Sequence, residues 1–484
     1  MADDGPIPCR LHCRKIRAVT TLDALSETLA GRQSASILGA NPAVADSSGF
    51  SYWAAEPRDV FEFTAEQTNP FLQLQNILSR YRLADEHADP CGMGLPPSGM
   101  FSGGWIGYFG YELGRYIERL PEKAADDLRL PLIRLCFYDR LIAYDHRSRA
   151  FWLLALELPD DSQKPQDKIA SLEHYLHESQ QLRHEEPFLA GIDDPDLAET
   201  RRNMSRQDYL DAVKRIQEHI RNGDVYQVNF SHRFEAPFYG RSIQLFDWQN
   251  RHNPCGYAAY IDAGNFQIVS ASPEMFVTVH DGLIRTKPIK GTRPRIDSSH
   301  RDASMLNARQ FHDLLTSKKE QAELNMIIDL ERNDVARICK PGTRQVIQPR
   351  TIEAYPTVFH AVATIQGELR DDITFGDILK AMFPGGSITG APKIRAMEII
   401  DDLEPTARGV YTGTIGFIGL DGAVCLNIAI RTIIITGDRA FVQTGGGIVA
   451  DSDPQAEWDE TMVKARALLT GIRAVETGCF VRRA

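Results

Sequence analysis

Residues 205–234 read SRQDYLDAVKRIQEHIRNGDVYQVNFSHRF, and this stretch predicts a helix followed by a strand. Ser205, with Asp208 three residues later, resembles a capping box, and Gly223 stands where a helix C-cap is expected. The apolar residues between them follow helical spacing: Leu210, Val213, Ile216 and Ile220. Residues 225–234 alternate, so the strand is expected to have two distinct faces, with Tyr226, Val228 and Phe230 on one and Gln227, Asn229 and Ser231 on the other.

Other apolar runs on both sides of this stretch also have the character of strands. After it, strands are expected at 266–271, 275–280, 413–420, 424–436 and 440–444. Many follow one another through short turns, which favours antiparallel pairing. Helices are interspersed rather than strictly alternating with strands, so the pattern favours an α+β fold over a doubly wound α/β fold.

A polar stretch at residues 158–204 is the candidate boundary in the chain, and it contains a predicted helix at 169–182. It separates an N-terminal region, residues 1–190, from a catalytic region, residues 200–475. We expect the two regions to be interwoven into one body, because the family resemblance described below implies one.

The composition excludes several classes of protein. The chain has 484 residues, of which 43% are hydrophobic and 25% charged, and a net charge of −11, so it is not expected to bind nucleic acid. No stretch approaches the roughly 20 apolar residues of a membrane span. The eight cysteines are scattered and the N-terminus lacks the apolar run of a signal peptide, which together indicate a reduced, cytoplasmic protein.

Two Glu-x-x-Glu segments lie on predicted helices, at Glu320 and Glu323 and at Glu457 and Glu460. The i, i+3 spacing puts each pair on one helix face, and Lys464 extends the second face. Two solvated helix faces would explain the pattern, because glutamate is mostly exposed. Carboxylates that converge in a cleft would instead need a cation, and Mg²⁺ prefers such hard oxygen ligands.

Lys290 stands just before Gly291 at the end of a short strand-like run. Arg293 and Arg295 nearby are compatible with ordinary surface charge. In an enclosed site the same neighbours, with Lys287, would lower the pKa of the lysine and favour a neutral nucleophile.

Glycines and an arginine near the C-terminal end suggest an anion site. Gly445, Gly446 and Gly447 follow a predicted strand, where glycines often expose amides to an anion, although tight turns use the same residues. Arg431 lies midway along an apolar strand and needs a partner. A substrate carboxylate and a structural Asp or Glu both satisfy that need.

At these residues the sequence resembles the chorismate-utilising enzymes, which include the anthranilate, aminodeoxychorismate, isochorismate and salicylate synthases. The resemblance covers about residues 205–470, in segments such as SASPEMFV, TKPIKGTRPR, AELNMIIDLERNDVARI, FPGGSITGAPKIRAMEII and TGGGIVADSDPQAEWDET. GGWIGYFGYELGR in the N-terminal half also resembles the family. The fold implied is two large antiparallel sheets packed face to face, with helices outside.

The resemblance implies a role for each matching position. Mg²⁺ is expected on Glu323 and Glu460, with Glu320 and Glu457 nearby. Chorismate is expected to contact Gln227, Gly291, Thr292, Tyr411, Arg431, Gly445, Gly446, Gly447 and Lys464. Glu274 is expected to be the general acid for the 4-hydroxyl, and His360 to lie close to the ring.

The residues at two positions indicate which of the family's reactions to expect. Isochorismate and salicylate synthases carry a lysine where this chain has Gln227, and an amide cannot activate water. Anthranilate synthases carry alanine where this chain has Lys290, whereas a lysine there is typical of aminodeoxychorismate synthases. The resemblance therefore implies amination of chorismate at C4 through a covalent Lys290 adduct, on the route to 4-aminobenzoate and folate.

Ammonia is expected from a separate glutamine amidotransferase subunit, because no cysteine here sits in a Gly-x-Cys-x-Gly turn. The alternatives are an anthranilate synthase large subunit and a non-catalytic binding paralogue.

Overall fold

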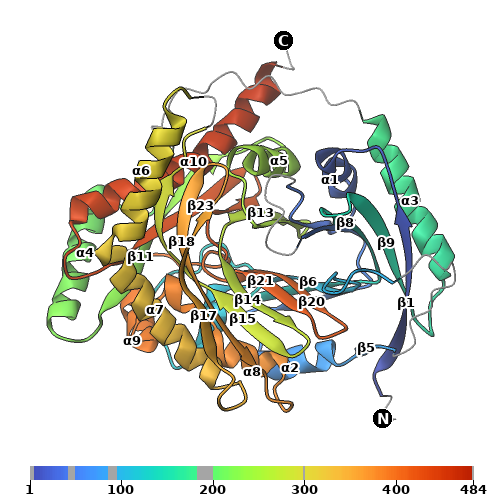
Figure 1. The fold of residues 1–484 in the computed structure, drawn as a ribbon, viewed down its shortest axis with the longest axis horizontal. Helices are drawn as coiled ribbons and strands as arrows, with labels where there is room; N and C mark the ends of the chain where they lie inside the picture. The colour runs from blue at the N-terminus through green and yellow to red at the C-terminus, as the bar shows by residue number, and fades with distance from the viewer. Residues whose placement is uncertain (1–4, 42–48, 85–94, 183–199, 298–299, 482–484) are drawn as a thin grey trace.

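The computed structural model describes residues 5–41, 49–84, 95–182, 200–297 and 300–481 (Figure 1). Within these residues the strands form one sheet of 13 and one of 10. The larger sheet runs in the order β10 (Arg201–Arg202), β11 (Gln227–Pro237), β23 (Arg439–Ile448), β22 (Thr432–Thr436), β13 (Phe266–Ser272), β12 (Tyr257–Asp262), β2 (Ser36–Leu38), β3 (Phe50–Ala54), β8 (Arg140–Asp145), β9 (Ala150–Glu157), β1 (Ile7–Ile16) and β5 (Tyr81–Leu83), with β19 (Gly390–Ala391) paired to β11.

The smaller sheet also contains strands from both the N-terminal and the catalytic region. Its order is β16 (Ile289–Pro294), β18 (Val358–Glu368), β15 (Leu283–Lys287), β14 (Met275–His280), β21 (Val424–Asn427), β20 (Thr414–Gly419), β6 (Gly104–Phe109), β7 (Ile133–Tyr138) and β4 (Asp59–Phe63), with β17 (Gln345–Ala354) paired to β18. Among the described strands, β1 and β5 form a parallel pair and the other neighbours are antiparallel.

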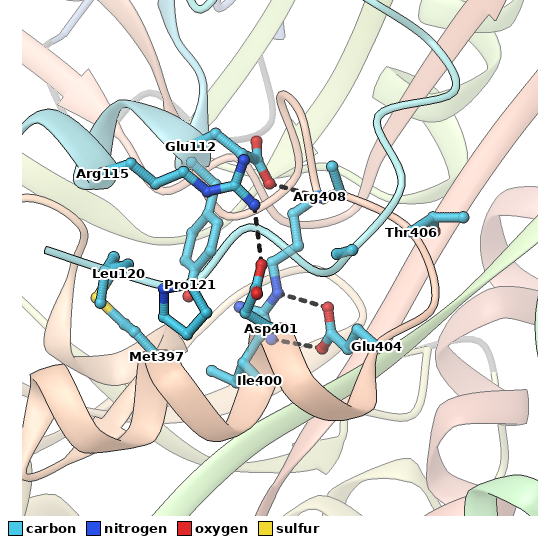
Figure 2. Close-up of a pocket in the computed structure, with 13 residues that line it drawn as sticks. Glu112, Arg115, Leu120, Pro121, Met397, Ile400, Asp401, Glu404, Thr406 and Arg408 are labelled. Atoms are coloured by element: carbon cyan, nitrogen blue, oxygen red, sulfur yellow. Dashed lines mark hydrogen bonds and ion pairs between the residues drawn. The ribbon is translucent and has the colours of Figure 1, made fainter.

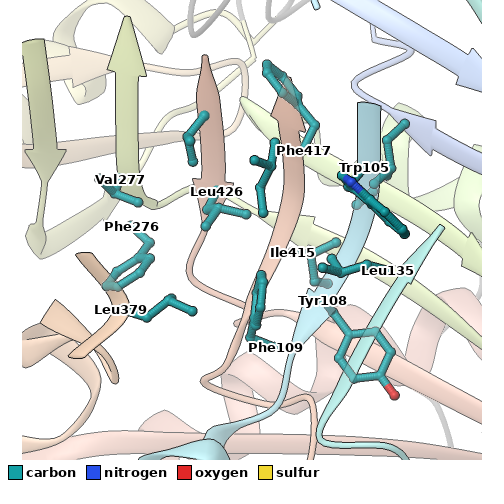
Figure 3. Close-up of a cluster of buried hydrophobic side chains, with 14 of the residues drawn as sticks. Trp105, Tyr108, Phe109, Leu135, Phe276, Val277, Leu379, Ile415, Phe417 and Leu426 are labelled. Carbon is teal, nitrogen blue, oxygen red and sulfur yellow. The ribbon is translucent and has the colours of Figure 1, made fainter. Parts of the chain in front are cut away.

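The main core lies between the two sheets. Figure 3 shows the aromatic side chains of β6, among them Trp105 and Phe109, beside those of β20. Tyr52 of β3 in the larger sheet meets Phe417 of β20 edge-on, with ring centroids 5.6 Å apart. Burying each such side chain stabilises the fold by about 1.5–3 kcal/mol. The predicted packing of two antiparallel sheets face to face is therefore confirmed.

Helices cover the outer faces of both sheets, as predicted. Their bounds are α1 (Leu22–Ala30), α2 (Pro70–Leu78), α3 (Pro165–Gln181), α4 (Arg206–Arg221), α5 (Ser242–His252), α6 (Ala303–Thr316), α7 (Lys318–Ala336), α8 (Phe375–Met382), α9 (Lys393–Leu403) and α10 (Pro454–Val481), with short 3-10 turns η1 (Tyr111–Tyr116) and η3 (Gly386–Ile388). Apolar residues of α1, α3, α5 and α10 form a second core on the larger sheet. Figure 1 shows α3 along β9 and β1, and α7 over the smaller sheet.

Strands from both halves of the chain share both sheets. In the smaller sheet Phe109 of β6 pairs with Thr414 of β20. In the larger sheet Ile37 of β2 pairs with Tyr260 of β12. The predicted boundary between residues 190 and 200 falls mainly in 183–199, outside the described residues.

The helix and strand predicted at 205–234 both form. The side chain of Ser205 accepts from the backbone N–H of Asp208, and the Asp208 carboxylate accepts from Ser205 in return, which completes the capping box of α4. Gly223, with φ of 81°, follows the helix. The strand begins at Gln227, so Tyr226 precedes it and is 72% exposed rather than sharing a face with Val228.

The predicted strand at 424–436 is instead two strands, because the chain leaves one sheet for the other. β21 belongs to the smaller sheet and β22 to the larger one. Residues 428–431 make the crossing. Within the described ranges, no helix combines the length and apolar character needed to span a lipid bilayer.

Candidate active site

Lys290 lies on β16 at an irregularity in its pairing with β18. The register shifts between Ile289 and Thr292, and Gly291 between them has φ of 91°. A Cβ at Gly291 would lie 2.4 Å from Oε2 of Glu320, so only glycine lets this carboxylate approach the strand. The Lys290 ammonium is half-buried and donates to the carbonyl of Ser387, with Nζ and O 3.2 Å apart.

Burial lowers the pKa of Lys290 below its usual value, while the Glu274 and Glu323 carboxylates oppose the shift. Lys464 adds to the lowering. The predicted effect of the enclosed site is confirmed, whereas Arg293, Arg295 and Lys287 are not among the main causes, because these cations face other partners. Arg293 pairs with Glu320, Arg295 donates to the Tyr355 carbonyl and Lys287 pairs with Glu353.

Glu274 is buried beside Lys290, in the turn between β13 and β14. Its Oε1 accepts from the backbone N–H of Ile289, with 3.3 Å between the atoms. Burial raises the pKa of Glu274, and the Ser387 hydroxyl and Lys290 partly offset the rise. The protonated acid is thus favoured more than for an exposed glutamate, as a proton donor requires.

His360 lies on β18 opposite Thr292, and its Nδ1 is 2.9 Å from the Thr292 hydroxyl. Burial, reinforced by Arg431, lowers the pKa of His360 to about 3. Its Nε2 is buried with no hydrogen-bond partner in the described part of the chain. The site therefore presents a neutral imidazole with one unused nitrogen.

Arg431 lies in the crossing between β21 and β22, not midway along a strand as predicted. Its φ is 51°, a left-handed conformation that is uncommon for arginine. Burial lowers the pKa of Arg431, while Cys255 and Glu274 oppose the shift. No residue in the described ranges forms an ion pair or hydrogen bond with its guanidinium. The N–H groups of the guanidinium are therefore available to a carboxylate.

Gly445, Gly446 and Gly447 lie inside β23 rather than in a loop after a strand, which corrects the prediction. They pair with Ser231, Phe230 and Asn229 of β11. A Cβ at Gly445 would lie 2.5 Å from the Phe230 carbonyl, so the close approach of the two strands explains why glycine is needed.

Gly447 faces Gln227 and Lys290. A Cβ at Gly447 would lie 2.4 Å from Nε2 of Gln227 and 3.6 Å from Nζ of Lys290. The Gln227 side chain is fully buried, and neither polar atom of its amide has a partner among the described residues. An unpartnered amide beside Lys290 is therefore available to a ligand.

The four glutamates come from α7 and α10. Ser317 caps α7 by accepting from the backbone N–H of Glu320. On α10, Glu457 accepts from the Ser452 hydroxyl at 2.7 Å, and Glu460 pairs with Lys464 at 2.8 Å. Lys464 Nζ also donates to the carbonyl of Gly445 at 2.9 Å, which ties α10 to β23.

The carboxylates of the two helices influence one another. Burial raises the pKa of Glu323 and of Glu457, and Glu460 adds to both rises. The pKa of Glu460 itself is lowered by Lys464. Glu323 on α7 and Glu460 on α10 therefore interact electrostatically with each other and with Lys290, although they are far apart in the sequence.

The glutamates of α7 and α10 offer oxygen ligands to Mg²⁺ without forming a closed cage. Within the described residues no three His, Cys, Asp or Glu side chains gather tightly enough to enclose a metal. Mg²⁺ is usually held by one or two carboxylates together with water and substrate oxygens, so a closed cage is not required. Oε2 of Glu320 is buried without a partner among these residues, which fits an oxygen reserved for a bound cation or its water.

Tyr411, another of the predicted site residues, lies next to the buried Arg408. Its side chain is buried, and its ring centroid lies 5.9 Å from Cζ of Arg408. Its neighbour Thr412 donates its backbone N–H to the carbonyl of Ala429, two residues before Arg431. Among the described residues, the Tyr411 ring thus contacts Arg408, and the backbone beside it reaches the segment that carries Arg431.

Sequence reasoning missed Ser387, whose carbonyl holds Lys290, and Arg408, which is almost fully buried. Glu404 caps the end of α9 and Arg408 lies in the irregular segment after it, so no helical spacing in the sequence pointed to this buried pair.

Comparisons with known proteins agree on one family. The family of chorismate binding enzymes matches residues 41–470. The chain is 38% identical over 385 residues to aminodeoxychorismate synthase component 1 of Bacillus subtilis, covering 79% of each chain. It is 36% identical over 434 residues to anthranilate synthase component 1 of Acinetobacter calcoaceticus, covering 86% of this chain and 82% of the relative.

Among solved structures, anthranilate synthase component I from Streptococcus pneumoniae superposes with a TM-score of 0.72 at 30% identity, covering 87% of this chain and 92% of the other. The menaquinone-specific isochorismate synthase from Escherichia coli superposes with a TM-score of 0.70 at 17% identity, covering 97% and 95%, which supports the fold alone.

Proposed function

The chain belongs to the chorismate-binding enzymes, and from that premise we propose that it is component 1 of an aminodeoxychorismate synthase. It would aminate chorismate at C4 and give 4-amino-4-deoxychorismate for 4-aminobenzoate and folate synthesis. Relatives with this activity and with anthranilate synthase activity are similarly close, so identity does not separate the two. The observation that carries the proposal is Lys290, half-buried beside Glu274 with a lowered pKa.

The first step of the proposed reaction forms a covalent adduct. The Lys290 ammonium transfers a proton to the Glu274 carboxylate, which produces a neutral amine and a neutral acid together. The amine attacks C2, the ring double bond shifts, and the 4-hydroxyl leaves as water with the proton from Glu274. The lowered pKa of Lys290 and the raised pKa of Glu274 both support this transfer.

The second step reverses the attachment. Ammonia attacks C4, the double bond shifts back, and the bond from C2 to Lys290 breaks. The amine then recovers a proton from the incoming ammonia, so the sum is chorismate and ammonia giving aminodeoxychorismate and water. Splitting one substitution into two allylic ones is the usual advantage of a covalent intermediate.

Other side chains would hold the substrate and exclude competing chemistry. Arg431, unpaired among the described residues, would receive a carboxylate through two parallel hydrogen bonds. His360 would offer its free Nε2 to the ring substituents. Gln227 cannot act as a base, which disfavours the addition of water at C2.

Mg²⁺ is part of the proposal, held by Glu323 and Glu460 with Glu320 and Glu457 close by. When bound, it would supply positive charge that orients the ring carboxylate and stabilises charge on it. The partnerless oxygen of Glu320 and the mutual repulsion of the glutamates support a cation here. Lys464, paired with Glu460, would keep that helix face next to β23.

A separate glutamine amidotransferase subunit would supply the ammonia. Both relatives are named component 1 of their synthases, which supports the existence of a partner component. The proposal also includes a cytosolic location, which free thiols such as those of Cys136 and Cys339 support.

Anthranilate synthase is the second candidate, favoured by relatives of that name at 36% identity and by the Streptococcus pneumoniae structure. The test is product identification by mass spectrometry from purified chain, chorismate, Mg²⁺ and ammonium. We expect aminodeoxychorismate, and 4-aminobenzoate after a lyase is added. Fluorescent anthranilate, or no product, would overturn the proposal. Glutamine should replace ammonium only when a glutaminase subunit is added.

A further inference from the structure

Figure 2 shows a pocket between η1 and α9 in which the buried Arg408 meets Glu404. The guanidinium bonds both carboxylate oxygens of Glu404, from Nε at 2.9 Å and from Nη2 at 2.7 Å. A buried ion pair needs its remaining donors satisfied to be tolerated. Here those donors go to three separate segments of the chain.

Each of these segments carries a residue of the candidate active site. Nη1 of Arg408 donates to the carbonyl of Ile388 at 3.0 Å, and the preceding Ser387 carbonyl accepts from Lys290. Nη2 donates to the carbonyl of Asn229 at 2.6 Å, two residues after Gln227 on β11. Nη1 also lies 3.3 Å from the Thr412 hydroxyl, beside Tyr411.

The N-terminal half of the chain fixes Arg408 in turn. Oε1 of Glu112 accepts from the backbone N–H of Arg408 at 2.8 Å, and its Oε2 accepts from Gly409 at 2.9 Å. Glu112 is buried on η1, in the GYFGYELG motif. Glu404 further accepts from the backbone N–H and the hydroxyl of Ser231 on β11.

We propose that Arg408 is a positioning residue which, with Glu112 and Glu404, sets where the Ser387 carbonyl and the Gln227 amide stand around Lys290. It acts through these groups and not by touching substrate. The N-terminal half thereby takes part in placing the active site. The effect on turnover rests on the proposed function, whereas the effect on Lys290 does not.

The first test replaces Arg408 with lysine. Arg408→Lys keeps the charge but loses the planar fork, so it cannot bridge Glu404, Ile388 and Asn229 together. A catalytic group displaced by about 1 Å loses on the order of 100-fold in rate, so we expect kcat to fall by that order with KM changed much less. Glu112→Gln is the milder second variant. We expect its kcat to fall about tenfold, because one acceptor oxygen remains.

Asp401→Asn is the matched control. Asp401 pairs with Arg115 at 2.8 Å across the same two elements and appears in Figure 2 beside Arg408. Among the described residues, its carboxylate accepts from Arg115 and from the backbone N–H of Lys123, and not from the segments around Lys290. We expect this variant to lower the melting temperature while kcat stays within about threefold of wild type.

A second readout does not depend on turnover. Lys290 is labelled with acetic anhydride across a pH series, and the labelled peptide is measured by mass spectrometry. The Ser387 carbonyl favours the ammonium form, so its displacement in Arg408→Lys should move the labelling midpoint to lower pH. The midpoint should be unchanged in Asp401→Asn.

The outcomes separate the two proposals. A shifted midpoint in an enzyme that makes no amination product supports the positioning role while the proposed function fails. If kcat and the midpoint of both Arg408→Lys and Glu112→Gln match wild type, the inference is overturned. The inference is also overturned if Asp401→Asn changes kcat and the labelling midpoint as much as Arg408→Lys does. General loosening of the pocket would then explain both changes.

Discussion

Gly447→Ala should remove most activity while leaving the fold intact. Gly447 lies in β23 opposite Asn229, and its backbone is not in the left-handed region, so alanine is compatible with the local conformation. The added methyl would lie 2.4 Å from Nε2 of Gln227. Ordinary contact begins at 3.4 Å, so the amide must retreat by about 1 Å.

The fully buried Gln227 has little room to retreat, and Lys290 Nζ, 3.6 Å from the same methyl, limits movement on that side. Overpacking of this kind costs about 1–3 kcal/mol of stability. A misplacement of about 1 Å among groups that contact substrate lowers the rate by a factor on the order of 100. We therefore expect a large fall in kcat/KM together with only a modest fall in the melting temperature.

The assay is ammonia-dependent turnover of chorismate, with thermal melting measured in parallel. Gly471→Ala is the control, because its added methyl would meet Nε2 of Gln249 and Cε3 of Trp248, both at 2.6 Å, between α10 and α5. This variant should lose comparable stability and keep its activity. The reasoning is refuted if Gly447→Ala retains kcat/KM within about threefold of wild type.

Three further results are expected. Lys290→Arg and Lys290→Ala should both lose most product, because arginine stays protonated and cannot attack carbon; near wild-type turnover of the arginine variant would exclude the nucleophile role. Glu323→Gln or Glu460→Gln should abolish Mg²⁺-dependent activity with the melting temperature retained, and full turnover in excess chelator would contradict the metal site. His232, whose pKa burial lowers from 6.5 to about 3, should make the protein less stable as the pH falls from 6.5 toward 3, because only the unfolded state takes up the proton. Between pH 7 and pH 5 the free energy of unfolding should fall by about 2 kcal/mol because of this histidine. In His232→Asn that part of the fall should be absent when unfolding is measured at both pH values.

Features set by neighbouring residues could be predicted from the sequence. The capping box of Ser205 and Asp208 and the start of α10 at Pro454 depend on side chains within one helical turn. The Glu460–Lys464 pair follows from i, i+4 geometry in the same way. Such local interactions need only the helix itself and do not depend on how it packs against the rest of the protein.

Features set by distant segments could not be predicted. The apolar run from 424 to 436 gives no sign that its middle changes sheets and places Arg431 between them. The need for glycine at 445 comes from the Phe230 carbonyl, more than 200 residues away. The lowered pKa of Lys290 likewise depends on burial among segments distant in the sequence and on Lys464 of α10, whereas its sequence neighbours turn to other partners.

The pairing of β11 with β23 has a consequence for biosynthesis. Pro237 pairs with Arg439, so the ribosome must add roughly 200 residues before β11 receives its partner. At about 5–20 residues per second, the nascent chain exposes that strand edge for roughly 10–40 s. An unpaired strand edge is a template for aggregation, so the newly made chain should depend on chaperones that shield such edges during translation.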